Sequence, residues 1–165
     1  MGTIGMGGRL NSGASCEWYT PPHIFDALGI SFDLDPCSPY GGIPWIPVAN
    51  HYFEFGLERE WFGSVWLNPP YGRETQAWVR KLAKHGDGVA LVFARTDAKW
   101  AQDAIRSSGA VCFIAGRISF IDGSGNDDRK GHNAAAASML IGFGDKCADA
   151  VAACGLGISF DRRLI

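Results

Sequence analysis

Short apolar runs alternate with amphipathic stretches along most of this chain. The run from Gly88 to Phe93 is apolar throughout and is followed by the polar Arg95-Thr96-Asp97, as is typical of a strand buried on both faces. Between Glu74 and His85 the apolar residues instead recur with helical spacing. The pattern predicts strands at 30–34, 64–67, 88–93, 110–115, 134–143 and 156–160. It predicts helices at 20–28, 74–85, 97–108 and 145–154, with Thr20 and Asp97 as N-caps.

Strands that alternate with helices of these lengths predict an α/β fold, a three-layer sandwich with a mostly parallel central sheet. We expect a flexible tail over residues 1–15 and a single domain over residues 16–165. The aromatic segment from Val48 to Phe62 has no clear period. In such sheets ligands bind beyond the carboxyl ends of the strands, so the segments after Leu34 and after Leu67 become candidate sites.

Composition excludes several classes of protein. The 165 residues are 47% hydrophobic and 19% charged, with a net charge of -2, which excludes a disordered chain and leaves the partner open. Five cysteines without close pairs and four scattered histidines indicate neither a disulfide framework nor a metal site. No apolar run approaches the roughly 20 residues that span a bilayer, and no signal pattern opens the chain, so we expect a cytoplasmic protein.

The segment Asn68-Pro69-Pro70-Tyr71 carries the clearest chemical signal. Two prolines supply no backbone donors and have nearly fixed φ angles, so the loop presents carbonyl oxygens and one side-chain amide in a rigid array. Such an array suits an amino group, and an exposed tyrosine beside it offers a face on which a planar ring can stack. The pattern therefore favours chemistry on a nucleobase amine. The alternative is a strand terminator whose tyrosine packs on the core.

Four segments, in this order, resemble the small phage-encoded DNA adenine methyltransferases, a Dam-like family that uses S-adenosylmethionine. They are Glu17-Trp18-Tyr19-Thr20-Pro21-Pro22, Phe32-Asp33-Leu34-Asp35-Pro36-Cys37, Asn68-Pro69-Pro70-Tyr71-Gly72 and Gly116-Arg117-Ile118-Ser119-Phe120. The resemblance implies a Rossmann-like class I methyltransferase fold and a site-specific enzyme that methylates the exocyclic amine of adenine in DNA. It also implies a phage origin. The biological role, shielding phage DNA from restriction or another, stays open.

The resemblance also implies roles for particular residues. Asn68, Pro69, Pro70 and Tyr71 would be catalytic, on a base flipped out of the duplex. Thr20, Pro21, Asp33, Asp35, Pro36 and Cys37 would bind the cofactor, and Arg117 the DNA substrate. Asp33 and Asp35 alternate along their strand and are expected on the same side. A simple turn explains Asp35-Pro36 nearly as well, and a helix cap explains Thr20-Pro21 equally well.

Other assignments stay open at this point. No Gly-x-Gly turn follows the first strand, and Glu54 and Glu58 are the candidates for holding the cofactor ribose. The polar loop from Asp122 to Asn133 is either a DNA contact or a solvated surface loop. Alternatives to DNA methylation are a methyltransferase that acts on RNA or protein, and an inactive nucleic-acid-binding module with the same fold.

Overall fold

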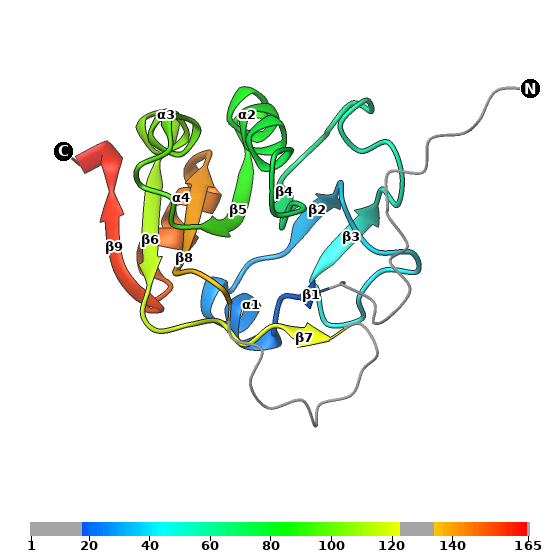
Figure 1. Ribbon diagram of the computed structural model, residues 1–165, viewed down its shortest axis with the longest axis horizontal. Coiled ribbons are helices and arrows are strands. Elements are labelled where there is room, and N and C mark those ends of the chain that lie inside the picture. Colours follow the sequence, from blue (N-terminus) through cyan, green and yellow to red (C-terminus); the bar gives the residue numbers. More distant parts are fainter. Residues whose placement is uncertain (1–17, 123–133, 165) are drawn as a thin grey trace, which may run out of the picture.

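The computed structural model describes residues 18–122 and 134–164, so the expected tail and nearly all of the polar loop lie outside the described residues. Its centre is a seven-stranded sheet with the strand order β3-β2-β4-β5-β8-β6-β9 (Figure 1). The strands are β2 (Phe32–Asp35), β3 (Val48–His51), β4 (Val65–Leu67), β5 (Gly88–Phe93), β6 (Ala110–Ile114), β8 (Ser138–Phe143) and β9 (Gly157–Asp161). A separate antiparallel pair joins β1 (Trp18–Tyr19) to β7 (Ile121–Asp122).

The expectation of a mostly parallel sheet is wrong. The ladders that join β3, β2, β4 and β5 are parallel, but the longer ladders between β5 and β8, β8 and β6, and β6 and β9 are antiparallel. Strand β8 runs against both of its neighbours. A continuous apolar run shows that a strand is buried on both faces and carries no signal for its direction, so sequence reasoning could not detect the reversal.

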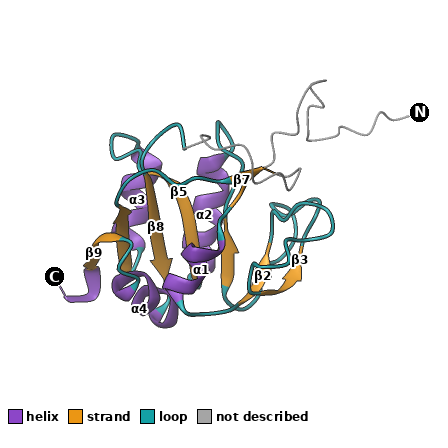
Figure 2. Cartoon of the chain, turned by 90° about the horizontal axis from the view of Figure 1, so that it is seen from below, coloured by secondary structure: helices purple, strands orange, loops and turns teal. Residues whose placement is uncertain are grey.

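The three layers are confirmed. Along β5, Val89 and Leu91 pack into one core cluster while Ala90 and Val92 pack into another, because successive side chains point to opposite faces. The first cluster includes residues of α1 (Pro22–Leu28) and α4 (Asp145–Ala153), and the second includes residues of α2 (Thr75–His85) and α3 (Lys99–Ser107). Figure 2 shows these two pairs of helices apart from each other. A short 3₁₀ helix, η1 (Arg162–Leu164), follows β9.

Most element boundaries agree with the predictions to within two residues, with specific exceptions. The N-caps are Pro21 and Ala98, and neither helix has a side-chain cap, so the predicted capping by Thr20 and Asp97 is wrong. The strand expected at 134–143 begins only at Ser138. Strand β3 lies in the stretch that had no clear period, and it has two exposed central residues.

Candidate functional site

The strand order reverses between β2 and β4. From β2 the chain first adds β3 on one side and then returns to add β4 on the other, all three strands being parallel. Such a switch point leaves a crevice at the carboxyl ends of its two strands. Asp35-Pro36-Cys37 lies at the end of β2, and Asn68 follows β4 directly. The Cys37 thiol donates a hydrogen bond to the Asn68 carbonyl at 3.1 Å. The structure therefore brings these two predicted segments together.

Asp35 is a buried acid without a cationic partner among the described residues. Asp35 is only 5% exposed, and the Cys37 backbone N–H donates a hydrogen bond to Asp35 Oδ1 at 3.1 Å. Burial raises the pKa of this carboxyl to about 7, against the smaller lowering effect of that hydrogen bond. Burial, together with the neighbouring Asp35, also raises the pKa of the Cys37 thiol. A cationic ligand group beside Asp35 would stabilise the carboxylate form.

Asp33 lies in a different environment from Asp35. Its Oδ2 accepts hydrogen bonds from the backbone N–H and the hydroxyl of Ser64, at 2.7 and 2.9 Å. These bonds lower its pKa and hold it beside the residue that precedes β4, at the opposite end of that strand from Asn68. The same carboxylate leaves no room for a side chain at Gly63, whose Cβ would lie 2.3 Å from Oδ2. The structure thus does not bring Asp33 together with Asp35, and its cofactor contact stays a prediction.

The hydroxyl of Thr75 fixes the loop after β4 through two hydrogen bonds. Thr75, at the start of α2, donates to the Pro70 carbonyl at 2.8 Å and accepts from the Gly72 N–H at 3.0 Å. Pro69 is buried and Pro70 is exposed, while Asn68 is half-buried. No described group donates to the Pro69 carbonyl. This oxygen and the Asn68 side chain are therefore the acceptors that the loop offers to a substrate.

Tyr71 is not the exposed side chain that the sequence predicts. Its ring stacks on Phe93, with centroids 4.1 Å apart and planes at 20°, and meets the edge of Phe120 at 6.3 Å. Its hydroxyl donates to Asn68 Oδ1 at 3.2 Å. Burial raises the pKa of the phenol. One ring face is thus occupied by Phe93, and one lone pair of the Asn68 oxygen is already used.

Three buried hydroxyls at the carboxyl end of the sheet have no hydrogen-bond partner among the described residues. They belong to Thr20, Ser38 and Ser138, which are at most 5% exposed. Thr20 precedes α1 and its carbonyl accepts from Trp45 Nε1 at 2.9 Å. Ser138 lies opposite Phe93, the residue under Tyr71. An unsatisfied buried hydroxyl costs about 1–3 kcal/mol, so a polar ligand that reaches these groups would relieve that cost.

Several of these residues were missed by sequence reasoning. Ser38, Trp45, Phe93 and Ser138 lie near the predicted segments only because the fold places them there. Ser138 carried a detectable signal, since it is a polar residue that opens the apolar run 138–143. Phe93 carried none, because its run reads as core throughout.

Arg117 is exposed and lies close to Ala134, the first described residue after the gap at 123–133. Its guanidinium donates to the Ala134 carbonyl at 3.1 Å, and the Ala134 N–H donates to the Ile118 carbonyl at 2.8 Å. Its contact with DNA stays a prediction. Glu54 and Glu58, the candidates for the ribose, are both exposed and follow β3.

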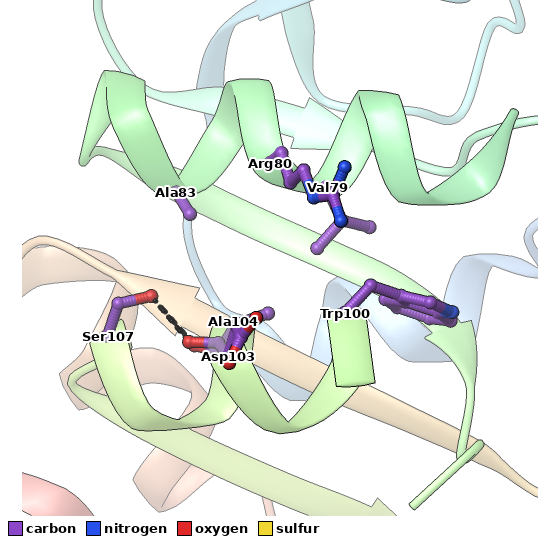
Figure 3. A pocket seen from close by; sticks show the side chains of 7 residues that line it. All are labelled: Val79, Arg80, Ala83, Trp100, Asp103, Ala104 and Ser107. Carbon is purple, nitrogen blue, oxygen red and sulfur yellow. Dashed lines mark hydrogen bonds between the residues drawn. The ribbon is translucent and has the colours of Figure 1, made fainter. Parts of the chain in front are cut away.

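A cavity of about 110 Å³ lies elsewhere, between α2 and α3 (Figure 3). It is lined by Val79, Arg80, Ala83, Trp100, Asp103, Ala104 and Ser107. All seven residues belong to the two helices, and none follows a strand end. The cavity is therefore separate from the switch point between β2 and β4.

The model of the DNA N-6-adenine-methyltransferase (Dam) family matches residues 9–146. The chain belongs to this family. The matched segment contains every predicted site residue from Thr20 to Arg117 and ends within α4. No curated protein and no solved structure matches the chain.

Membership in the Dam family identifies the chain as a methyltransferase of the kind that modifies adenine in DNA. Within the described ranges, no group of three or more His, Cys, Asp or Glu side chains is arranged to hold a metal ion. None of the described helices has the length and apolar character needed to cross a membrane.

Proposed function

We propose that this protein transfers a methyl group from S-adenosylmethionine to the exocyclic amine of adenine in DNA. The observation that carries the proposal is the contact between the two loops at the switch point, where Cys37 bonds Asn68. It places the loop with carbonyl and amide acceptors beside a buried carboxylate, within a sheet whose order is compatible with a Rossmann-like methyltransferase fold. The family match supports both the reaction and the substrate.

The residues at the crevice fit the cofactor. When bound, S-adenosylmethionine supplies a methyl group on a positively charged sulfur atom. Asp35 provides a buried carboxylate for a cationic group, and the unpartnered hydroxyls of Thr20, Ser38 and Ser138 provide hydrogen bonds for polar groups. Pro21 and Pro36, both buried, form rigid walls of the same region.

The Asn68 loop orients the amine. The lone pair of an adenine amine is delocalised into the ring, so the site must hold the nitrogen towards tetrahedral geometry. Asn68 Oδ1 and the Pro69 carbonyl each accept one amine hydrogen, and the lone pair then points towards the methyl group. Positioning supplies much of the rate, and the proton leaves to water after transfer. The base must be flipped out of the duplex, and stacking on the outer face of Tyr71 offsets part of that cost.

The test is to incubate the purified protein with unmethylated DNA and S-adenosylmethionine, digest the DNA to nucleosides and identify methylated bases by mass spectrometry. We expect N6-methyladenine, located at a defined sequence when the modified sites are mapped. Asn68→Ala should lower the rate by about 10²–10³-fold, a magnitude typical of removing one positioned polar group. Gln76→Ala, which removes a similar amide from the exposed surface of α2, should leave the rate unchanged.

Other products would contradict the proposal in different ways. Methylcytosine would refute the choice of base. Methylation of RNA or protein in place of DNA would refute the substrate. An absence of cofactor binding by calorimetry would favour an inactive nucleic-acid-binding module.

A further inference from the structure

Strand β9 presents an unpaired apolar edge at one side of the sheet (Figure 1). Its inner side pairs with β6, and no described strand pairs with its outer side. Ile158 and Phe160 are 68% and 48% exposed, and Leu164 just beyond is 84% exposed. Natural edge strands usually carry lysine, proline or a bulge that blocks pairing, and β9 has none of these in its five residues. The strand also lies beyond the residues that the Dam family model matches.

The two faces of β9 differ in their cover. Ser159 points to α4, because its hydroxyl donates to the Val151 carbonyl at 3.2 Å. Asp161 lies on the same face, where Arg163 pairs with it and with Asp149 of α4. Ile158 and Phe160 lie on the opposite face, since side chains alternate along a strand. There Phe160 meets only the edge of Phe113 among described aromatic rings. Ile158 and Phe160 therefore form a small exposed apolar patch on one face of β9.

The backbone register shows which groups point outwards. The Arg162 N–H donates to the Gly109 carbonyl, and the Ala115 N–H donates to the Leu156 carbonyl, at 2.8 and 2.9 Å. In an antiparallel pair, hydrogen-bonded and non-hydrogen-bonded positions alternate. Residues 156, 158, 160 and 162 therefore bond towards β6. The N–H and C=O groups of Gly157, Ser159 and Asp161 point away from the sheet.

We propose that β9 pairs with β9 of a second copy of this chain, antiparallel about a twofold axis through Ser159, to form a homodimer with one continuous sheet. In this register Ser159 faces its own copy and Gly157 faces Asp161, so each outward-pointing pair exchanges two backbone hydrogen bonds. Ile158 then lies opposite Phe160 at both non-hydrogen-bonded positions, where side chains approach most closely. The same four side chains that are exposed in two separate chains become one apolar cluster.

Charge does not oppose this pairing. Asp161 is the one charged residue in the strand, it is already paired with Arg163, and it lies opposite a glycine. An isologous contact of this kind closes on itself, because it uses the β9 edge of both copies. Five-residue strands form a small interface, so the dimer should be weak and should depend on concentration. The inference does not depend on methyl transfer.

The test is sedimentation equilibrium of the full chain across a wide range of concentrations, with and without a charged substitution in the apolar patch of Ile158 and Phe160. The unchanged chain should show a reversible monomer–dimer equilibrium. Phe160→Lys should weaken it at least about tenfold, because two lysines enter one apolar cluster. Phe62→Lys is the matched control, since Phe62 is 45% exposed and lies before β4, and it should leave dimerisation unchanged. Circular dichroism of both variants checks that they fold.

A cysteine cross-link tests the register separately. Two Ser159→Cys residues face each other at a hydrogen-bonded position with Cα atoms about 5.5 Å apart, within the range of a disulfide. Two Ile158→Cys residues lie on a diagonal of about 7–8 Å and should cross-link much less under the same oxidation, measured against the unchanged chain. A chain that stays monomeric at every concentration would overturn the proposal. So would a dimer that Phe160→Lys does not weaken, or equal cross-linking at the two positions.

Discussion

The buried carboxyl of Asp35 should make the stability of this protein fall as the pH rises through neutrality. Its pKa is raised by burial from 3.8 to about 7, while in the unfolded chain it is solvated and ordinary. Between pH 4 and pH 7 the unfolded chain therefore loses a proton that the folded chain keeps. Stability from this group is fully present below pH 4 and is lost as the pH rises to about 7. This sign is the reverse of that of most carboxylates in folded proteins.

The magnitude follows from the difference between the two pKa values. It is about three pH units, and each corresponds to 1.36 kcal/mol, so Asp35 costs the folded state about 4 kcal/mol above pH 7 compared with pH 4. Asp35→Asn removes the ionisation but keeps an oxygen that can accept from the Cys37 N–H. The free energy of unfolding of the variant should therefore rise relative to that of the unchanged protein as the pH rises, by about 3 kcal/mol between pH 5 and pH 8.

The assay is urea unfolding of both proteins at several pH values, compared as differences so that other ionisable groups cancel. Asp33→Asn is the matched control of opposite sign, because hydrogen bonds from Ser64 lower the pKa of Asp33. That variant should be less stable than the unchanged protein at neutral pH, and the difference should shrink only below about pH 4, as the pH falls through the lowered pKa of Asp33. A difference between Asp35→Asn and the unchanged protein that stays constant from pH 5 to pH 8 would refute the reasoning.

Two further substitutions test the loops at the switch point. Gly56→Ala should destabilise the protein by about 1–3 kcal/mol or more in urea unfolding and weaken cofactor binding, because its Cβ would lie 1.8 Å from the Pro36 carbonyl oxygen. Unchanged stability would show that this contact can relax. Tyr71→Phe should keep the stack on Phe93 but free the Asn68 amide to turn, so kcat should fall with little change in the KM for DNA. A rise in KM alone would instead indicate that the hydroxyl contacts DNA.

The layers of the fold follow from the sequence more readily than the direction of its strands. Apolar runs such as 88–93 locate strands because burial on both faces requires them, and helical spacing over 74–85 locates α2 to within one residue. Strand β8 pairs antiparallel with both β5 and β6, and no local pattern in the sequence records this direction. Strand β3 was missed because its central residues, Ala49 and Asn50, are exposed and break the apolar signal.

The candidate site was predicted as separate segments rather than as an arrangement. Sequence reasoning placed Asp35 and Asn68 at strand ends, and the strand order then brought those ends together. It failed at Tyr71, because a tyrosine in a turn looks exposed until a residue 22 positions later, Phe93, is seen to lie under it. Sequence reasoning also gave Asp33 the same role as Asp35. The alternation of side chains along a four-residue strand cannot show that the Ser64 hydroxyl donates a hydrogen bond to the Asp33 carboxylate.

The contacts around Asn68 narrow the chemistry that this loop can perform. The Cys37 thiol occupies its backbone carbonyl, the Tyr71 hydroxyl occupies one lone pair of Oδ1, and Thr75 occupies the Pro70 carbonyl. The acceptors left over are the second lone pair of Oδ1 and the Pro69 carbonyl, with no backbone donor from either proline. These two acceptors can bind both hydrogens of one amino group, and the Asn68 amide nitrogen is the side-chain donor of the same loop. The contacts are therefore compatible with a primary amine as the bound group, which agrees with the family to which the chain belongs.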